Sequence, residues 1–338
     1  MISPARRFLA SCVTGRCIAI AIAVVALIAV PFAIGEVYYV NIASQVLLYA
    51  VFALGLNVLV GYAGLVSLGH AGLFGVAAYV TAYLLAAGYG HLVAILTAIA
   101  AGLIATAGFA ALALRAGGIS FIMISLALGE IIWGLAYRWI SLTNGDNGIS
   151  VATRPEPFGL PLTSARSFYD ATLVVFLVAV AACAIFVRSP FGAALCGTRD
   201  QPRRMNTLGY HVWMIRFWAF MFSGLLTSVA GILFVYYNEF ISPQALALTA
   251  SAEGLLMVIS GGAGTLLGPV IGAALVVIVK NVVSAYVTRW NFMLGAIFVA
   301  IVVFMPEGLV PGGVRLSRSA WRVLSRRKPA VIGAGPPS

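Results

Sequence analysis

The sequence predicts an all-α polytopic membrane protein with about ten transmembrane helices and with both termini in the cytoplasm. Hydrophobic residues make up 62% of the 338 residues and charged residues only 9%, whereas a soluble domain carries roughly 25% charged residues. The mean hydropathy is +1.06. Apolar runs of about 20 residues, the length that crosses a bilayer, recur along the chain. Together these observations exclude an ordinary soluble domain.

The apolar runs give the order of the expected spans. They cover residues 18–34, 42–60, 70–87, 92–114, 119–140, 171–187, 213–236, 251–260, 267–287 and 292–310. The first run resembles a signal peptide, but its length favours an uncleaved span. The chain then divides into a cytoplasmic N-terminus (1–17), a transmembrane domain (18–310) and a basic cytoplasmic tail (311–338).

The basic residues fix the expected orientation, because loops rich in Lys and Arg stay on the cytoplasmic side. With both termini inside, the cytoplasmic segments hold most of the chain's 20 basic residues: Arg6, Arg7, Arg16, Arg115, Arg188, Arg199, Arg203, Arg204, Arg216, Arg315, Arg318, Arg322, Arg326, Arg327 and Lys328. These residues are divided among short segments rather than gathered on one domain, so nucleic acid is not an expected partner. Trp321 among the arginines of the tail favours a short helix on anionic membrane lipid, and the Gly- and Pro-rich residues beyond it indicate partial disorder.

The segment 188–212 is the longest expected cytoplasmic loop and is predicted to bind a partner. A short helix is expected from Gln201 to Leu208. Asp200 can cap that helix, Pro202 suits its first turn, and Gly209 can end it. Its other distinctive residues are Arg199, Arg203 and Arg204. On the opposite side of the membrane, residues 142–170 form the other long connection, either an external binding surface or a solvated loop.

Two glycine-rich stretches interrupt the apolar runs and predict broken or re-entrant backbone, because each glycine costs close to 1 kcal/mol in a helix relative to alanine. The first stretch runs from Gly61 to Gly72 and contains Gly64, Ser67, Gly69 and His70, and the second contains Gly261, Gly262, Gly264, Thr265 and Gly268. Broken backbone at membrane depth must be buried in protein or line a wet cavity. Paired breaks point to a transport pathway or hinge, while close packing of helices by small residues is the alternative.

Few ionisable residues fall inside the expected spans. Glu130, Glu253, Lys280 and His70 are hypotheses for function, since a charge in hydrocarbon costs at least ~2.5 kcal/mol. A proton relay through the two glutamates would suit a secondary transporter. A role as hydrogen-bond acceptors for broken backbone, or as solute contacts, would suit an ATP-driven one.

The chemistry of enzymes is not indicated. His70 has no second His or Cys at ligand spacing, so no metal is expected, and no Ser-His-Asp or Cys-His set occurs in a soluble loop. The glycine stretches lack the Lys-Ser or Lys-Thr of a P-loop. No cofactor and no nucleotide site are therefore expected in this chain.

Several stretches together carry a family resemblance. They are IASQVLLYAVFALGLNVLVGYAGLVSLGHAGLFGVAAYVTA (42–82), GGISFIMISLALGEI (117–131), TNGDNGI (143–149), SPFGAAL (189–195) with the following TRD and LGY, FWAFMFSGLLTSVAGILFVYYNEFISP (217–243), SAEGLLMVISGGAGTLLGPVIGAAL (251–275) and MPEGL (305–309). The chain resembles, over roughly 40 to 315, the permeases of branched-chain amino-acid ABC importers of the LivM type.

The resemblance implies a transport subunit that works with partners. These would be a second homologous permease, two cytoplasmic ATP-binding subunits and an external solute-binding protein, with uptake by alternating access. The loop at Arg199–Gly209 would then couple the permease to the ATPase. After Arg-Asp this chain has Gln201-Pro202-Arg203-Arg204 where the family usually has Asn-Glu, which makes the docking surface more basic. Relatives that carry urea, short amides or organic acids leave the solute open, and an ion-coupled secondary transporter remains the alternative class.

Overall fold

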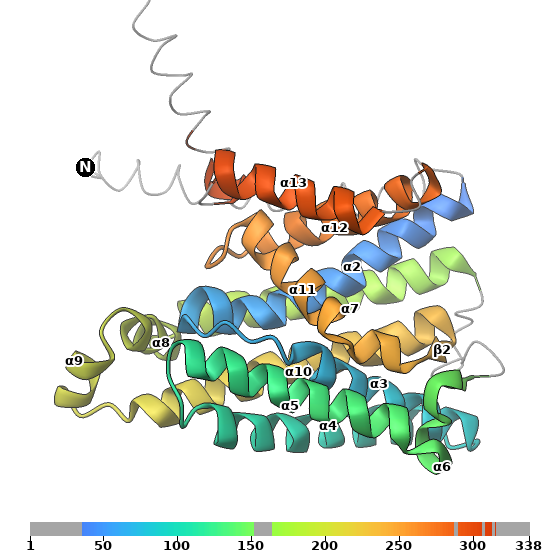
Figure 1. The fold of residues 1–338 in the computed structure, drawn as a ribbon, viewed down its shortest axis with the longest axis horizontal. Helices are drawn as coiled ribbons and strands as arrows, with labels where there is room; N and C mark the ends of the chain where they lie inside the picture. Colours follow the sequence, from blue (N-terminus) through green and yellow to red (C-terminus); the bar gives the residue numbers. More distant parts are fainter. Residues whose placement is uncertain (1–35, 152–163, 287–289, 306–307, 313–314, 316–338) are drawn as a thin grey trace, which may run out of the picture.

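The computed structural model describes residues 36–151, 164–286, 290–305, 308–312 and 315, and these form a bundle of α-helices (Figure 1). The long helices are α2 (Val37–Asn57), α3 (His70–Ala86), α4 (His91–Ala113), α5 (Ile119–Arg138), α7 (Ala165–Arg188), α10 (Val212–Asn238), α11 (Leu248–Gly261), α12 (Gly268–Tyr286) and α13 (Trp290–Phe304). The expected span at 18–34, the N-terminal segment and most of the tail lie outside the described residues. The prediction of an all-α membrane protein is confirmed.

Short elements connect the long helices. They are the π-helical turn η1 (Val58–Ala63), α6 (Ile140–Thr143), η2 (Gly145–Asn147), α8 (Pro190–Asp200), α9 (Pro202–Thr207), η4 (Pro243–Leu246), and the strands β1 (Ile149–Ser150) and β2 (Phe240–Ile241). The two strands pair antiparallel, with Ile149 opposite Ile241.

Five helices of the described chain are long and apolar enough to cross a membrane: α2 with η1, α4, α5, α7 and α10. Helices α3 and α11 have 17 and 14 residues, fewer than the about 20 that a full crossing needs. Both of these helices border a glycine-rich stretch, since α3 begins in the first and α11 ends in the second. The polytopic class is therefore established, while ten full crossings and the placement of the termini stay predictions.

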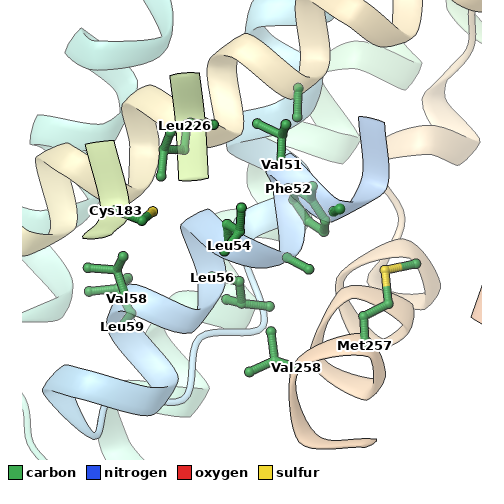
Figure 2. Close-up of a cluster of buried hydrophobic side chains, with 14 of the residues drawn as sticks. Val51, Phe52, Leu54, Leu56, Val58, Leu59, Cys183, Leu226, Met257 and Val258 are labelled. Carbon is green, nitrogen blue, oxygen red and sulfur yellow. The ribbon is translucent and has the colours of Figure 1, made fainter. Parts of the chain in front are cut away.

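Helix α2 forms the centre of the bundle. In the most apolar segment of α2 with η1, 78% of the residues are buried, compared with 22% in α5 and 28% in α4 and in α7. A helix that is apolar on all sides is expected to be buried in this way. Figure 2 shows side chains of α2, Phe52 and Leu54 among them, against Leu226 of α10 and Met257 of α11. The outer helices present apolar side chains such as Ile104 and Ile185 outward, as lipid contact requires.

The connections gather at two opposite ends of the bundle, with α8 and α9 at one end and α6 and β2 at the other (Figure 1). The arginines of the expected cytoplasmic loop lie at the first end. Asp146 in η2 and Glu239 before β2 lie at the second. Arg138 at the end of α5 and Arg166 at the start of α7 also lie at the second end, and the predicted orientation, with the α8–α9 end in the cytoplasm, stays a prediction.

Candidate functional site

The two glycine-rich stretches meet at one place in the bundle, although about 200 residues separate them. Asn57, at the end of α2, accepts a hydrogen bond from the Gly264 amide through Oδ1 and donates one to the Thr265 carbonyl through Nδ2, both at 2.9 Å. A Cβ atom on Gly61 would lie 2.7 Å from Gly264 Cα. The absence of a side chain therefore allows the two backbones to touch.

Both stretches contain non-helical backbone, as predicted, but each break is shorter than the glycine pattern. Gly61 still belongs to η1 and Gly72 to α3, so the first break covers residues 64–69. The second separates α11, which ends at Gly261, from α12, which begins at Gly268. Positive φ angles of 68° at Gly64 and 80° at Gly264 explain why glycine suits these two positions.

Buried side chains satisfy the polar groups of the first break. His70 Nδ1 lies 2.8 Å from Ser67 Oγ, and His70 Nε2 lies 3.0 Å from Ser223 Oγ. Since Ser223 Oγ donates to the Gly55 carbonyl at 2.6 Å, it accepts from His70 Nε2–H, which leaves Nδ1 to accept from Ser67. This arrangement gives both ring nitrogens of His70 a protein partner and gives the side chain a structural role.

Two further serines hold the same break. Ser125 of α5 accepts a hydrogen bond from the Leu68 amide at 3.2 Å, and Ser251 of α11 accepts one from the Ala71 amide at 3.0 Å. Gly69 faces α5 directly, since a Cβ there would lie 2.8 Å from a ring carbon of Phe109 and closer still to the Ser125 carbonyl oxygen. Ser67 and Gly69 of the break are thus buried in protein, as backbone at membrane depth must be, whereas Gly64 at its start is exposed.

The expected cytoplasmic loop consists of two short helices, of which α8 was not predicted. Ser189 caps α8 by accepting a hydrogen bond from the Gly192 amide at 3.2 Å, and Pro190 occupies its first turn. That pair of residues is a recognisable start signal for a helix. Arg216 of α10 donates to the Thr198 carbonyl at 2.7 Å, which fixes the end of α8 against the bundle.

The prediction that Asp200 caps the second helix is wrong. Asp200 is the last residue of α8, and α9 begins at Pro202 after Gln201, which has φ −143° and ψ 75° and makes no side-chain cap. A residue before proline is disfavoured in the helical conformation. Because Gln201 precedes Pro202, it is the non-helical residue next to α9, and Asp200 lies one position too early to be the cap. Gly209, with φ 86°, follows α9 in the left-handed conformation that ends helices, as expected.

Arg199 connects α8 to the place where the glycine breaks meet. Its Nη1 donates to the Gly61 carbonyl at 2.6 Å, and its Nε donates to Asp200 Oδ1 at 2.9 Å. A Cβ on Gly64 would lie 2.5 Å from Arg199 Cγ, so the aliphatic part of the arginine covers this glycine. The remaining predicted loop residues, Gln201, Pro202, Arg203, Arg204 and Gly209, are exposed.

A cavity of about 300 Å³ lies between α2, α3, α10, α11 and α12. Its wall is largely apolar, with Phe52, Phe74 and Phe234 among the lining side chains, and it also contains Ser242 and Gln244, which follow β2. The cavity therefore lies toward the β2 end of the bundle, opposite α8 and α9.

Glu253 and Lys280 bring the two charges of this cavity together. Lys280 Nζ lies 3.1 Å from Glu253 Oε2 and 3.3 Å from Oε1, and the two side chains are 35% and 18% exposed. Glu130 is half-buried on α5 and is not among the residues that line the cavity. The two glutamates that the sequence grouped together thus have different surroundings.

Asn57 is a site residue that the sequence analysis missed, and Lys280 was named there as an intramembrane charge whose partner was not predicted. A polar side chain in an apolar run was the available signal for both, but nothing local indicates their partners. Among the residues that the structure describes, no three His, Cys, Asp or Glu side chains come together as a possible metal site.

A bundle of apolar helices with paired backbone breaks, an internal cavity and arginine-rich helices at one end defines a membrane permease. Comparison with known proteins agrees. The chain belongs to the family of branched-chain amino acid transport system permease components, whose model matches residues 38–302. It is accordingly a transport subunit of the multi-pass type found in the bacterial inner membrane.

Individual relatives support this assignment. The chain is 31% identical to the high-affinity branched-chain amino acid transport system permease protein LivM of Escherichia coli K12, over 80% of this chain and 70% of LivM. It is 30% identical to LivM of Salmonella typhimurium over the same shares. LivH of Escherichia coli K12, also a permease protein of that system, is 23% identical over 78% of this chain and 91% of LivH. No solved structure matches the chain.

Proposed function

We propose that the chain is the membrane-spanning permease subunit of an ABC importer that carries branched-chain or related amino acids into the cell by alternating access. The energy comes from separate ATPase subunits that dock on α8 and α9. Membership of the permease family and the names of the relatives support the solute class. The opposed ends of the bundle support the direction of docking (Figure 1).

The complete transporter contains a second homologous permease, two ATP-binding subunits and an external solute-binding protein. The α8–α9 end carries Arg188, Arg199, Arg203 and Arg204, and these would face acidic groups of the ATPase. The solute-binding protein would dock at the end with α6 and β2, where the cavity lies. The stoichiometry of two permeases and two ATP-binding subunits is the one that the family resemblance implies.

The contact between Arg199 and the Gly61 carbonyl is the observation that carries the mechanism. A helix that moves with the ATPase would pull on this carbonyl, and Gly61 lies against Gly264. Glycine backbone accepts changes of φ and ψ that other residues resist. Movement of α8 would therefore change the angle between α2 and α3 and between α11 and α12, which opens the bundle on one side and closes it on the other.

The docking surface is tested by reversing charge on α9. In a complex purified through a tag on this chain, Arg203→Glu with Arg204→Glu is expected to release the ATPase subunits or to abolish solute-stimulated ATP hydrolysis. Pairs of exposed charges contribute only about 0–1 kcal/mol to the free energy of unfolding. The permease itself is therefore expected to stay folded in the double variant. Arg115→Glu, which changes a charge outside α8 and α9, is the matched control. Normal co-purification and normal stimulated hydrolysis in the double variant would rule out docking at α9.

A further inference from the structure

We propose that Glu253 and Lys280 form a contact site for the transported solute inside the permease, and that the site recognises a zwitterionic amino acid. This inference rests on the proposed transport function and adds to it a site and the two side chains that would recognise the solute. The carboxylate of Glu253 would bind the solute's ammonium, and the ammonium of Lys280 would bind its carboxylate.

The geometry suits a solute with both charges on adjacent groups. The two side chains come from different helices, α11 and α12, and meet at 3.1 Å in the wall of the cavity. An α-amino acid carries its ammonium and carboxylate on one carbon atom. Its ammonium can therefore lie beside the Glu253 carboxylate while its carboxylate lies beside the Lys280 ammonium. The four charges then alternate in sign, and Glu253 and Lys280 stay in contact.

The charge balance also favours a zwitterion. The pair is neutral, and a zwitterion is neutral, so binding moves no net charge into a region where an uncompensated charge is costly. A dicarboxylate would leave one carboxylate beside Glu253, and like charges repel. Urea carries no charge, so each of its hydrogen bonds to the pair is assisted by a charge on the protein side only, and it forms no ion pair with Glu253 or Lys280.

The remaining wall of the cavity fits the other part of such a solute. Phe52, Phe74, Phe234 and Met257 line the space next to the charged pair, and they offer an apolar surface to an aliphatic side chain. The volume of about 300 Å³ falls at the lower limit of cavities that hold small ligands, about 300–1,000 Å³. A small amino acid with an apolar side chain satisfies both the charged pair and the apolar wall.

A purely structural ion pair predicts different behaviour. Replacing such a pair by neutral residues of similar size is often tolerated, because the attraction is offset by the loss of hydration. A solute site loses its function when it becomes neutral, even if the fold persists. The double variant Glu253→Gln with Lys280→Met therefore separates the two roles.

The experiment uses the whole complex, with its ATPase subunits and binding protein, in proteoliposomes supplied with ATP and labelled leucine. We expect the double variant to assemble and to hydrolyse ATP. Its rate of leucine uptake is expected to fall at least about tenfold, which corresponds to ~1.4 kcal/mol of lost binding free energy in the pathway. Glu130→Gln, a carboxylate change outside the cavity, is expected to keep its uptake. Wild-type uptake of the double variant would overturn the solute site and leave the proposed function intact. Failure of the unaltered complex to take up any amino acid would reject both.

A second measurement reports binding directly and remains informative if the double variant does not fold. In Thr249→Cys, which places a thiol on the cavity wall one helical turn from Glu253 and keeps both charges of the pair, the rate of modification by an ethylammonium methanethiosulfonate reagent is expected to fall when leucine is present, with the unaltered chain as the control for its native cysteines. Urea and succinate are expected to have little effect. Equal protection by urea or succinate would contradict a zwitterion site, and no protection by leucine would contradict a site at this pair.

Discussion

Arg199 joins two parts of the molecule that lie 138 residues apart in the sequence, α8 and the carbonyl of Gly61. A hydrogen bond from a charged donor contributes about 1.5–3 kcal/mol, but the side chain is 42% exposed, so solvent screening reduces its contribution to roughly 1 kcal/mol or less. Such a contact adds little to the stability of the fold. Its value lies in its position between the docking helices and the glycine breaks.

Arg199→Gln is expected to fold and to retain the ATPase subunits while losing coupling. Removal of the contact leaves the two glycine breaks in place but disconnects them from α8. We predict about tenfold slower uptake, equivalent to ~1.4 kcal/mol of coupling free energy, with little change in the melting temperature of the complex. Asp200→Asn removes only the exposed ion pair with Arg199 and is expected to transport normally. Unimpaired uptake by Arg199→Gln would show that the contact does not transmit movement.

At the scale of elements, the glycine breaks explain why α3 and α11 are short. The sequence predicted both breaks, because four or five glycines in so few residues oppose a regular helix. It did not predict that the breaks touch, since local patterns carry no information on contacts over about 200 residues. Helix α8 was not predicted, although Ser189 and Pro190 form a start signal for a helix. Asp200 does not cap α9, because Pro202 favours a non-helical conformation for Gln201, which makes Gln201 the residue next to the helix.

Bulky residues in the breaks are expected to stop transport. A leucine at Gly61 would place its Cβ against the backbone of Gly264, and one at Gly69 would meet Phe109 and the backbone of Ser125. Overpacking of this kind costs typically 1–3 kcal/mol or more, because backbone moves less readily than a side chain. We predict that both variants lose uptake and that their melting temperatures fall.

Gly134→Leu on α5 is the matched control, because a Cβ there would have no atom within 4 Å. It is expected to assemble and to transport like the unaltered chain. Normal uptake by Gly61→Leu and Gly69→Leu would mean that the glycines serve only as spacers between helices.

At the scale of the whole molecule, the proposed mechanism assigns different tasks to the two ends of the bundle. The end with α8 and α9 holds the arginines of the loop and the contact of Arg199 with Gly61. The other end holds β2 (Figure 1), and Ser242 and Gln244, which follow β2, line the cavity. Composition and charge placement were sufficient to predict the fold class and the position of the exposed, arginine-rich loop, whose docking role stays a prediction. The cavity and its charged pair were not predictable, because they arise from helices α2, α3, α10, α11 and α12 that meet only in the folded chain.

The source of energy separates an ABC permease from an ion-coupled transporter. A proton-coupled secondary transporter requires an intramembrane carboxylate that gains and loses a proton, and Glu130 on α5 is a carboxylate outside the cavity that would serve. We expect Glu130→Gln, which keeps the size of the side chain and its ability to form hydrogen bonds, to retain most of its ATP-dependent uptake. Loss of uptake in this variant alone would point to proton coupling.

The most direct measurement is the uptake of labelled leucine into vesicles that contain the complete complex, with ATP inside, binding protein outside, and the membrane potential and proton gradient both collapsed by ionophores. Energy supplied through α8 and α9 does not depend on either gradient. We therefore predict that uptake continues under these conditions and stops when ATP is omitted. Uptake that ignores ATP, requires the proton gradient and disappears in Glu130→Gln would contradict the assignment as an ABC permease.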